Sequence, residues 1–316
     1  MFGRSVAFGV VFAVAALGLS ACTAAPDRTQ EAARLQSEIA VMPGVQQFSA
    51  YTSNNITQGT RLGMSADMHG ADREQIVAVV ARIKQLEGHD FDKYQQKAEF
   101  YVADKATIVR EGGLDAGQIA DDSLRLRQFA TSAAANIDAV EWTRSGKSSR
   151  LWIAKGQHPF EILAAADTAF ADQAVRLQMI TNADSDYQWW TVSLPLSADR
   201  RTAVEQLLST LPGQTSSVTV RDGHISRLIV EIAPRDVPET ALRAMIAAIA
   251  PTTAHPLLLM WRQGLSDNAL RFAGSVDVGA CDYTNEYGSD LRADLATPDS
   301  TALQDKLRAE YDTCRR

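Results

Sequence analysis

Short stretches in which apolar and polar residues alternate predict β-strands that bury one face. The clearest is Arg61–Met68, where Leu62, Met64 and Ala66 alternate with polar or small neighbours. Another predicted strand, Val45–Tyr51, comes just before it. Together the two stretches predict a two-stranded segment.

Apolar residues three and four positions apart predict amphipathic helices next to such strands. The row Ile76, Val79, Val80 and Ile83 has this spacing, and Asp72 stands where a helix N-cap belongs. A second row with the same spacing comes late in the chain, and each of its residues lies 166 positions after its counterpart in the first row. That second row is Leu242, Met245, Ile246 and Ile249.

The strand residues Leu62, Met64 and Ala66 keep the same offset to Leu228, Val230 and Ile232, and Asp222-Gly223 is a strong hairpin signal before the later strand. Shared spacing across a strand and a helix indicates a duplicated architecture. It does not by itself indicate a shared function.

A weaker middle copy has a hairpin around Ser145-Gly146 and an alanine-rich helix over Glu161–Phe170. Alternating strands favour antiparallel sheets with helices on one face. We therefore predict an α+β fold of repeated helix–β-hairpin units with mainly antiparallel sheets. The predicted modules cover residues 31–132, 133–211 (the weaker copy) and 212–316.

The first residues have the pattern of an export signal. Arg4 carries a positive charge, and Ser5–Gly18 is uncharged, mostly apolar and too short for a permanent membrane-spanning helix. Leu19-Ser20-Ala21-Cys22 follows and resembles the lipobox of bacterial lipoprotein precursors. The resemblance implies a diacylglyceryl group on Cys22 and cleavage after Ala21. An ordinary secretory signal that contains a cysteine is the alternative.

On this interpretation residues 1–21 are a lipoprotein signal peptide and residues 22–30 a tether. The lipid would anchor the protein to the extracytoplasmic face of a bacterial cell membrane. The formal net charge of −7 and the pI near 5.3 argue against nucleic acid as a partner. They also argue against electrostatic attraction to anionic lipid headgroups, so the lipid itself would make the attachment.

Cys281 and Cys314 are the other two of the three cysteines. An even pair outside the cytoplasm is most often a disulfide, which here would join a predicted last helix to its sheet. Cys314 continues the apolar row Leu303, Leu307 and Tyr311, and Cys281 ends a predicted strand. Metal binding is the weaker alternative, because no C-x-x-C motif or histidine cluster accompanies these cysteines.

The short polar motifs are incomplete as catalytic or metal sites. Ser145–Ser148 ends like a P-loop, but Glu141 stands where its first glycine belongs, so a hairpin turn is the better interpretation. Asn182, Asp184 and Asp186 have the spacing of a calcium loop without its glycine and glutamate, which favours a polar turn.

The five histidines are scattered, with no H-E-x-x-H motif, and no G-x-S-x-G elbow follows the signal segment. We therefore predict no catalytic residue, no metal and no cofactor. A Ser-His-Asp triad assembled from distant segments stays open.

Three aromatic residues, Tyr187, Trp189 and Trp190, lie close together in a predicted strand. In a strand Trp189 and Trp190 face opposite sides, so one large ring is expected near the surface. Such a ring is typical of a ligand or partner surface. Core packing with shielding of an interface is the alternative interpretation.

These features predict a lipid-anchored, non-enzymatic binding or interaction protein of the cell envelope, with a protein, glycan or lipid as its partner. Two alternatives stay open. A solute- or lipid-binding transport protein would be favoured by a parallel sheet or by a large apolar cavity. A hydrolase acting on envelope material would need a catalytic cluster that the spacing of residues does not reveal.

Overall fold

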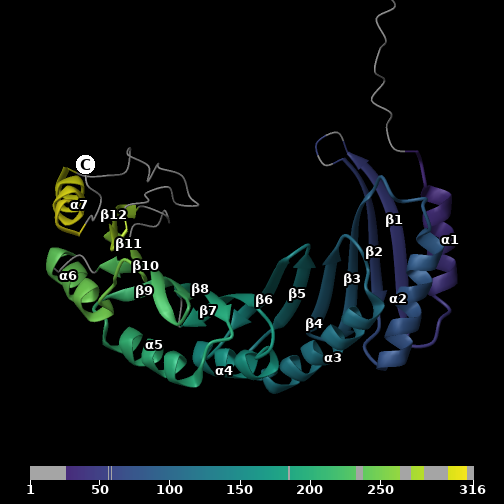
Figure 1. Ribbon diagram of the computed structural model, residues 1–316, viewed down its shortest axis with the longest axis horizontal. Coiled ribbons are helices and arrows are strands. Elements are labelled where there is room, and N and C mark those ends of the chain that lie inside the picture. Colours follow the sequence, from purple (N-terminus) through teal and green to yellow (C-terminus); the bar gives the residue numbers. More distant parts are fainter. Residues whose placement is uncertain are drawn as a thin grey trace, which may run out of the picture.

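A computed structural model describes residues 26–55, 57, 59–183, 186–232, 238–263, 272–280 and 298–311. Within them, twelve strands form one sheet in which the order across the sheet is the order along the chain. The fold is α+β, as the sequence predicts. Figure 1 shows that the sheet is curved into an arch, with its strands on the inner side and α2 to α6 on the outer side.

After a first helix, the order of elements is two strands and then a helix, six times over. The strands are β1 (Gln47–Asn55), β2 (Gly59–Asp67), β3 (Gln95–Ala103), β4 (Ala106–Glu111), β5 (Ala139–Ser145), β6 (Ser148–Gly156), β7 (Val175–Ala183), β8 (Asp186–Leu194), β9 (Gln214–Arg221), β10 (His224–Ile232), β11 (Leu257–Gln263) and β12 (Phe272–Val278). The helices are α1 (Thr29–Ile39), α2 (Arg73–Glu87), α3 (Ala116–Ser132), α4 (Pro159–Ala169), α5 (Ala198–Thr210), α6 (Pro238–Ile249) and α7 (Pro298–Tyr311).

Strand pairing alternates between antiparallel and parallel, which differs from the mainly antiparallel sheets that the sequence predicts. The two strands of each hairpin are antiparallel, as in β1–β2 and β5–β6. The last strand of one hairpin is parallel to the first strand of the next, as in β2–β3 and β6–β7. The reason is that each helix carries the chain back along the sheet before the next hairpin begins, and this crossover makes the pair parallel.

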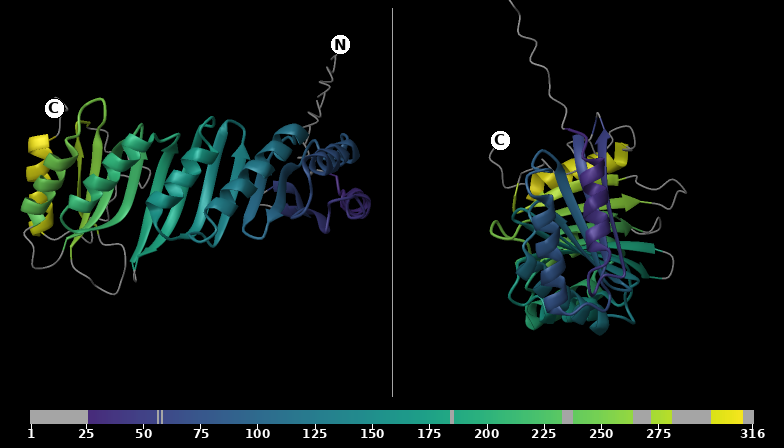
Figure 2. Two further views of the ribbon diagram at one scale, coloured as in Figure 1. Left: turned by 90° about the horizontal axis from the view of Figure 1, so that it is seen from below. Right: turned by 90° about the vertical axis from the view of Figure 1, so that its right-hand side faces the viewer.

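The sheet continues across both predicted module boundaries. Ile108 of β4 pairs with Trp142 of β5, and Trp190 of β8 pairs with Val218 of β9. In Figure 2 the helices of the outer layer lie side by side over one face of the sheet.

The core lies between the sheet and the outer helices. Strand side chains that face the helices are buried, and α2 contributes Ile76, Val79, Val80 and Ile83, the row that its sequence predicts. Asp72 caps this helix in a capping box with Gln75. The buried rings of Phe129, Trp142 and Phe170 fill the same layer further along the arch, with edge-to-face contacts at centroid distances of 4.8 and 5.7 Å.

Both outer edges of the sheet are covered by a helix. The Gln36 side chain of α1 accepts a hydrogen bond from the backbone N–H of Ala50 in β1, at 3.3 Å. At the other edge, the Gln304 side chain of α7 accepts one from the backbone N–H of Ser275 in β12, at 2.9 Å. Edge strands that are partnered in this way are protected from pairing with another chain.

Candidate binding site on the inner face of the sheet

We call the side of the sheet that faces away from α2 to α6 the inner face. Trp189 lies on it with half of its surface exposed, whereas its neighbour Trp190 points into the core and is 3% exposed. Trp190 packs edge-to-face on Phe160 of α4, with ring centroids 5.4 Å apart. The prediction that one of the two rings lies near the surface is confirmed. Tyr187 pairs with Asn182 in the β7–β8 ladder, and its side chain is outside the described residues.

Trp189 contacts a second tryptophan that comes from another hairpin. Trp152 of β6 lies 5.6 Å from it between ring centroids, at an interplanar angle of 48°. Strand β7 runs between them, with Gln178 opposite Trp152 and Ile180 opposite Trp189. Two strand spacings amount to about 10 Å, so only long side chains can meet over the middle strand. The pair forms an aromatic platform at the middle of the arch.

Polar and basic side chains flank the platform on one side. Arg150 of β6 pairs in register with Arg176 of β7, and both are exposed. Glu141 lies 3.8 Å from the Arg150 guanidinium. Like charges directly opposite each other destabilise a sheet, and the Glu141 carboxylate offsets part of this repulsion.

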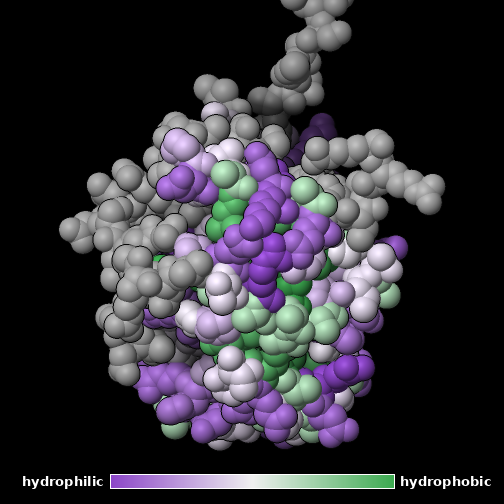
Figure 3. All heavy atoms as spheres, turned by 90° about the vertical axis from the view of Figure 1, so that its left-hand side faces the viewer, coloured by the Kyte–Doolittle hydropathy of each residue, from purple (hydrophilic) through white to green (hydrophobic). Residues whose placement is uncertain are grey.

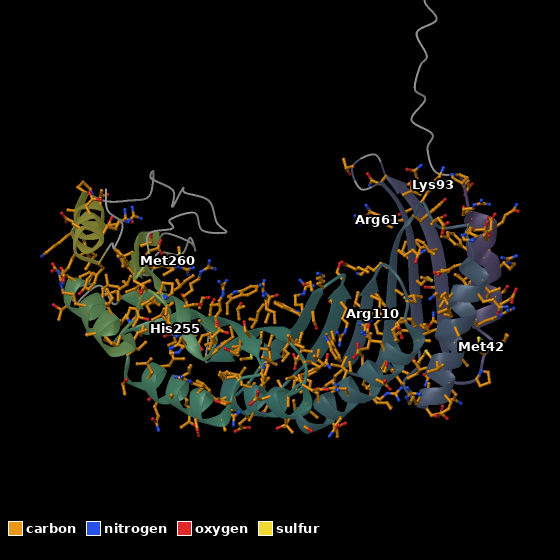
Figure 4. The ribbon with its side chains drawn as sticks, in the orientation of Figure 1. Met42, Arg61, Lys93, Arg110, His255 and Met260 are labelled. Atoms are coloured by element: carbon orange, nitrogen blue, oxygen red, sulfur yellow. The ribbon has the colours of Figure 1, made fainter. Side chains whose placement is uncertain are left out.

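Toward β12 the inner face becomes apolar and buried. Trp189 pairs with Ser217 of β9, Ser217 pairs with Ile229 of β10, and Ile229 pairs with Met260 of β11. These four residues therefore form one row across the sheet. Ile229 is 7% exposed and Met260 is fully buried, although both face away from the helix layer. Figure 4 labels Met260 near this end of the arch and Arg61 near the other, both toward its inner side, with Met42 on the outer side.

Toward β1 the inner face is polar. The Ser49 and Ser65 hydroxyls lie 2.9 Å apart, and Tyr51 covers Gly63 so closely that a Cβ there would lie 2.4 Å from the ring. Lys97 pairs with Glu99 at 2.7 Å, and this hydrogen bond raises the pKa of the Lys97 ammonium. The inner face therefore changes from polar at β1, through the aromatic platform, to buried apolar residues at β10 and β11.

Several predicted residues lie outside the described part of the chain. These are Cys22 with the rest of the lipobox, and Cys281 and Cys314. The Ser145–Ser148 segment is the β5–β6 turn, as predicted. Among the described residues no three histidine, cysteine, aspartate or glutamate side chains gather as metal ligands.

Sequence reasoning missed two juxtapositions. Trp152 and Trp189 belong to different hairpins, so no local spacing connects them. His224 and His255 were treated as scattered, yet their rings stack with centroids 3.7 Å apart. Alternation in β6, which turns Trp152 away from Leu151 and Ile153, is the one signal that could have placed its ring on the inner face.

Comparison of the chain with protein-family models, with curated proteins and with solved structures found no match. None of the helices in the described ranges is both long enough and apolar enough to cross a membrane.

Proposed function

We propose that this chain is a lipid-anchored binding protein of the bacterial cell envelope and that its inner face holds a partner protein. The observation that carries the proposal is the Trp152–Trp189 platform at the middle of the concave inner face of the sheet. The half-exposed Trp189 ring on this concave face favours binding, because a large apolar ring left in water is otherwise costly.

The size of the inner face favours a protein over a small solute. Twelve strands at their usual spacing give an arc of roughly 50 Å, far longer than a drug-sized ligand. Stacked repeat units commonly use such extended concave surfaces to bind other proteins. Tryptophan and arginine are the residues most enriched at the energetic centre of protein interfaces, and here Arg150 and Arg176 lie next to the platform.

The transport alternative has less support. Parallel pairing occurs, but a parallel sheet of a solute receptor is covered by helices on both faces, whereas α2 to α6 cover only the outer one. The layer between sheet and helices is filled by core side chains, among them Phe129, Trp142 and Phe170.

The anchor, the disulfide and the repeats belong to the same proposal. The lipid on Cys22 would tether the arch to the membrane, and a Cys281–Cys314 bridge would fix α7 to the sheet. The Arg308 guanidinium donates to the Ser275 carbonyl oxygen at 3.0 Å, so the elements next to the two cysteines already lie side by side.

We further propose that the six hairpin–helix units descend from one repeated unit.

Site-specific photocrosslinking in the native host tests the partner surface. A photoreactive residue at Gln178, on the inner face, should capture one protein, and the capture should be lost when Trp189→Ala is added. The same residue at Leu124, an exposed position of α3 on the outer layer, is the matched control. Capture from Leu124 as efficient as from Gln178, or capture that does not change with Trp189→Ala, would reject the inner face as the binding surface.

Metabolic labelling with a fatty acid tests the anchor separately. The label should be incorporated into the wild-type chain and absent from Cys22→Ser, which should leave the membrane fraction. Label retained by the Cys22→Ser variant would contradict the lipoprotein assignment without affecting the proposal for the inner face.

A further inference from the structure

A pocket separate from the aromatic platform opens in the helix layer. It has a volume of about 170 Å³ and lies between α5, the β9–β10 turn and the connection from α6 to β11. Its lining divides into two parts of different chemistry: three nitrogen-bearing side chains and a wall of apolar ones.

The nitrogen-bearing part consists of Arg200, His224 and His255. The two imidazole rings stack with centroids 3.7 Å apart and an interplanar angle of 15°. The Arg200 stem lies over Gly223, where a Cβ would meet its Cγ at 2.8 Å. Among the described residues the Arg200 guanidinium has no carboxylate partner. Three groups that carry or can gain positive charge therefore converge on one small space.

The positions of these groups are built into the backbone. His224 follows directly after the Asp222-Gly223 turn of the β9–β10 hairpin. His255 is held by reciprocal backbone hydrogen bonds with Thr252, each 3.1 Å long. The connection also contains Ala250 at φ +49°, a conformation that costs free energy for a residue with a side chain. Backbone strain of this kind is often retained at functional sites.

The apolar wall comes from Val204 and Leu207 of α5, Ile225 of β10 and Ile249 of α6. A cavity of about 150 Å³ lined by such residues is large enough for a benzene ring. The pocket thus offers an apolar volume for a small ring or branched chain, with a cationic side next to it.

The surrounding helix layer gives an independent reason to regard this place as special. Ion pairs link the other neighbouring helices or their ends: Arg82–Glu38 for α2 and α1, Arg73–Asp121 for α2 and α3, Arg125–Asp172 for α3 and the end of α4, Arg201–Asp167 for α5 and α4, and Lys306–Glu239 for α7 and α6. In the described part of the chain no ion pair joins α5 to α6.

Figure 3 views the molecule from the end that carries α6 and α7, where apolar side chains appear below a band of hydrophilic ones.

We propose that the pocket between α5 and α6 binds a small carboxylate with an apolar body, such as an aromatic or branched aliphatic acid. The carboxylate would accept hydrogen bonds from Arg200 and the histidine rings, and the apolar body would lie against Val204, Leu207 and Ile249. A charged hydrogen bond to a guanidinium is among the stronger polar contacts available to such a ligand.

The charges that face His224 predict how binding depends on pH. Burial lowers the pKa of His224, and His255 and Arg200 lower it further, while Asp222 of the turn opposes them. A bound carboxylate would offset that repulsion and raise the pKa of His224. Binding should therefore strengthen as the pH falls below about 6.5, where the His224 imidazole gains a proton.

Nuclear magnetic resonance titration of the histidine ring signals tests the proposal, with benzoate as the probe and benzamide as its neutral counterpart. Benzoate should shift the His224 and His255 signals saturably, with a dissociation constant of about 1 mM or below. Arg200→Gln should weaken binding at least tenfold, whereas Arg221→Gln, an exposed arginine of the neighbouring strand that does not line the pocket, should leave it within twofold.

Two outcomes would overturn the proposal. Benzamide binding as tightly as benzoate would show an apolar pocket that does not recognise the carboxylate. An absence of saturable shifts with millimolar benzoate would show that the pocket does not take such acids. Because Arg200 is exposed, Arg200→Gln should keep the fold, and an unchanged far-ultraviolet circular dichroism spectrum would verify this. His255→Gln provides a second variant, which replaces one imidazole ring of the pocket without touching α5.

Discussion

The two halves of the helix layer are held together in different ways. From α1 to α4, buried or partly buried arginines tie neighbouring units to one another. Arg127 of α3 donates to the carbonyl oxygens of Val102, Ala71 and Met68 at 2.6, 2.5 and 2.7 Å, and so joins α3 to β3 and to the loop before α2. Between α5 and α6 the described residues provide a pocket instead of such a link.

The strongest link in the first half is a buried ionic cluster. Asp122 of α3 accepts hydrogen bonds from Arg110 of β4 and from Arg144 of β5, the latter at 2.8 Å from Nε. Burial raises the pKa of Asp122 and lowers the pKa of Arg110 to about 10, so both charges are costly to hold in place. Such clusters contribute geometry more than net stability, because desolvation offsets much of the attraction. The difference teaches that α3 is positioned by charge pairing, whereas α5 and α6 leave room for a ligand.

The largest expected effect tests that cluster. Asp122→Asn leaves two guanidinium groups near each other without a carboxylate and should lower the free energy of unfolding by about 3–5 kcal/mol. The measurement is chemical denaturation at pH 7. Asp121→Asn is the matched control: it removes only the exposed pair with Arg73 and should cost at most about 1 kcal/mol. Equal losses of stability from the two substitutions would contradict the view that the buried cluster, rather than the exposed ion pair, holds α3 in place.

A second test uses a buried acid at the end of α2. Glu87 is 6% exposed, and burial raises its pKa to about 7 from 4.5. The folded state therefore keeps a proton that the unfolded state loses, and stability should fall as the pH rises from about 4.5 to about 7. Above that window the penalty is on the order of 3 kcal/mol, and Glu87→Gln should remove it. Denaturation at pH 8 should find the variant more stable, and at pH 4 the two proteins should be alike.

The third test concerns the arginine that spans units. Arg127→Gln removes three hydrogen bonds from a charged group to backbone carbonyl oxygens and should cost about 2 kcal/mol. Arg125→Gln, on the same helix, breaks a more exposed pair with Asp172 and one hydrogen bond to the Ala169 carbonyl oxygen, and it should cost about 1 kcal/mol. If Arg125→Gln lowered stability more than Arg127→Gln, the ion pair with Asp172 would contribute more to this half than the three backbone hydrogen bonds of Arg127.

The smallest expected effect lies in the second half, at the strained connection after α6. Ala250→Gly should stabilise the protein by about 1 kcal/mol, because glycine adopts φ +49° without strain. Ala247→Gly, a substitution inside α6, should destabilise the protein by a similar amount. Thermal denaturation of both variants gives the comparison. A loss of stability from Ala250→Gly would mean that the connection carries no strain to release.

Much of the local structure follows from sequence patterns. The Asp72 cap, the Asp222-Gly223 turn and the split of Trp189 and Trp190 between two faces all have local causes, and the structure agrees with each. Helix α3 was not predicted. Its buried positions include Asp122 and Ser123, so the apolar row that marks an amphipathic helix is interrupted there.

The candidate sites were predictable only in part. Trp189 was singled out because alternation along one strand decides which way its ring points. Its partner Trp152, the stacked His224 and His255, and Arg200 beside them come from separate hairpins and helices. Contacts of this kind depend on how strands order themselves in the sheet, which short-range periodicity does not encode.

The sequence by itself determined the α+β class, many of the strands and helices, and the face to which side chains such as Trp189 and Trp190 turn, because these follow from spacings of two to four residues. Only the tertiary structure decided that hairpins join in parallel through helices into one curved sheet, and that α2 to α6 all lie on its outer side. The physical reason is that twist, crossover and packing act between segments tens of residues apart, and those contacts bring the tryptophans of the inner face and the histidines of the pocket together.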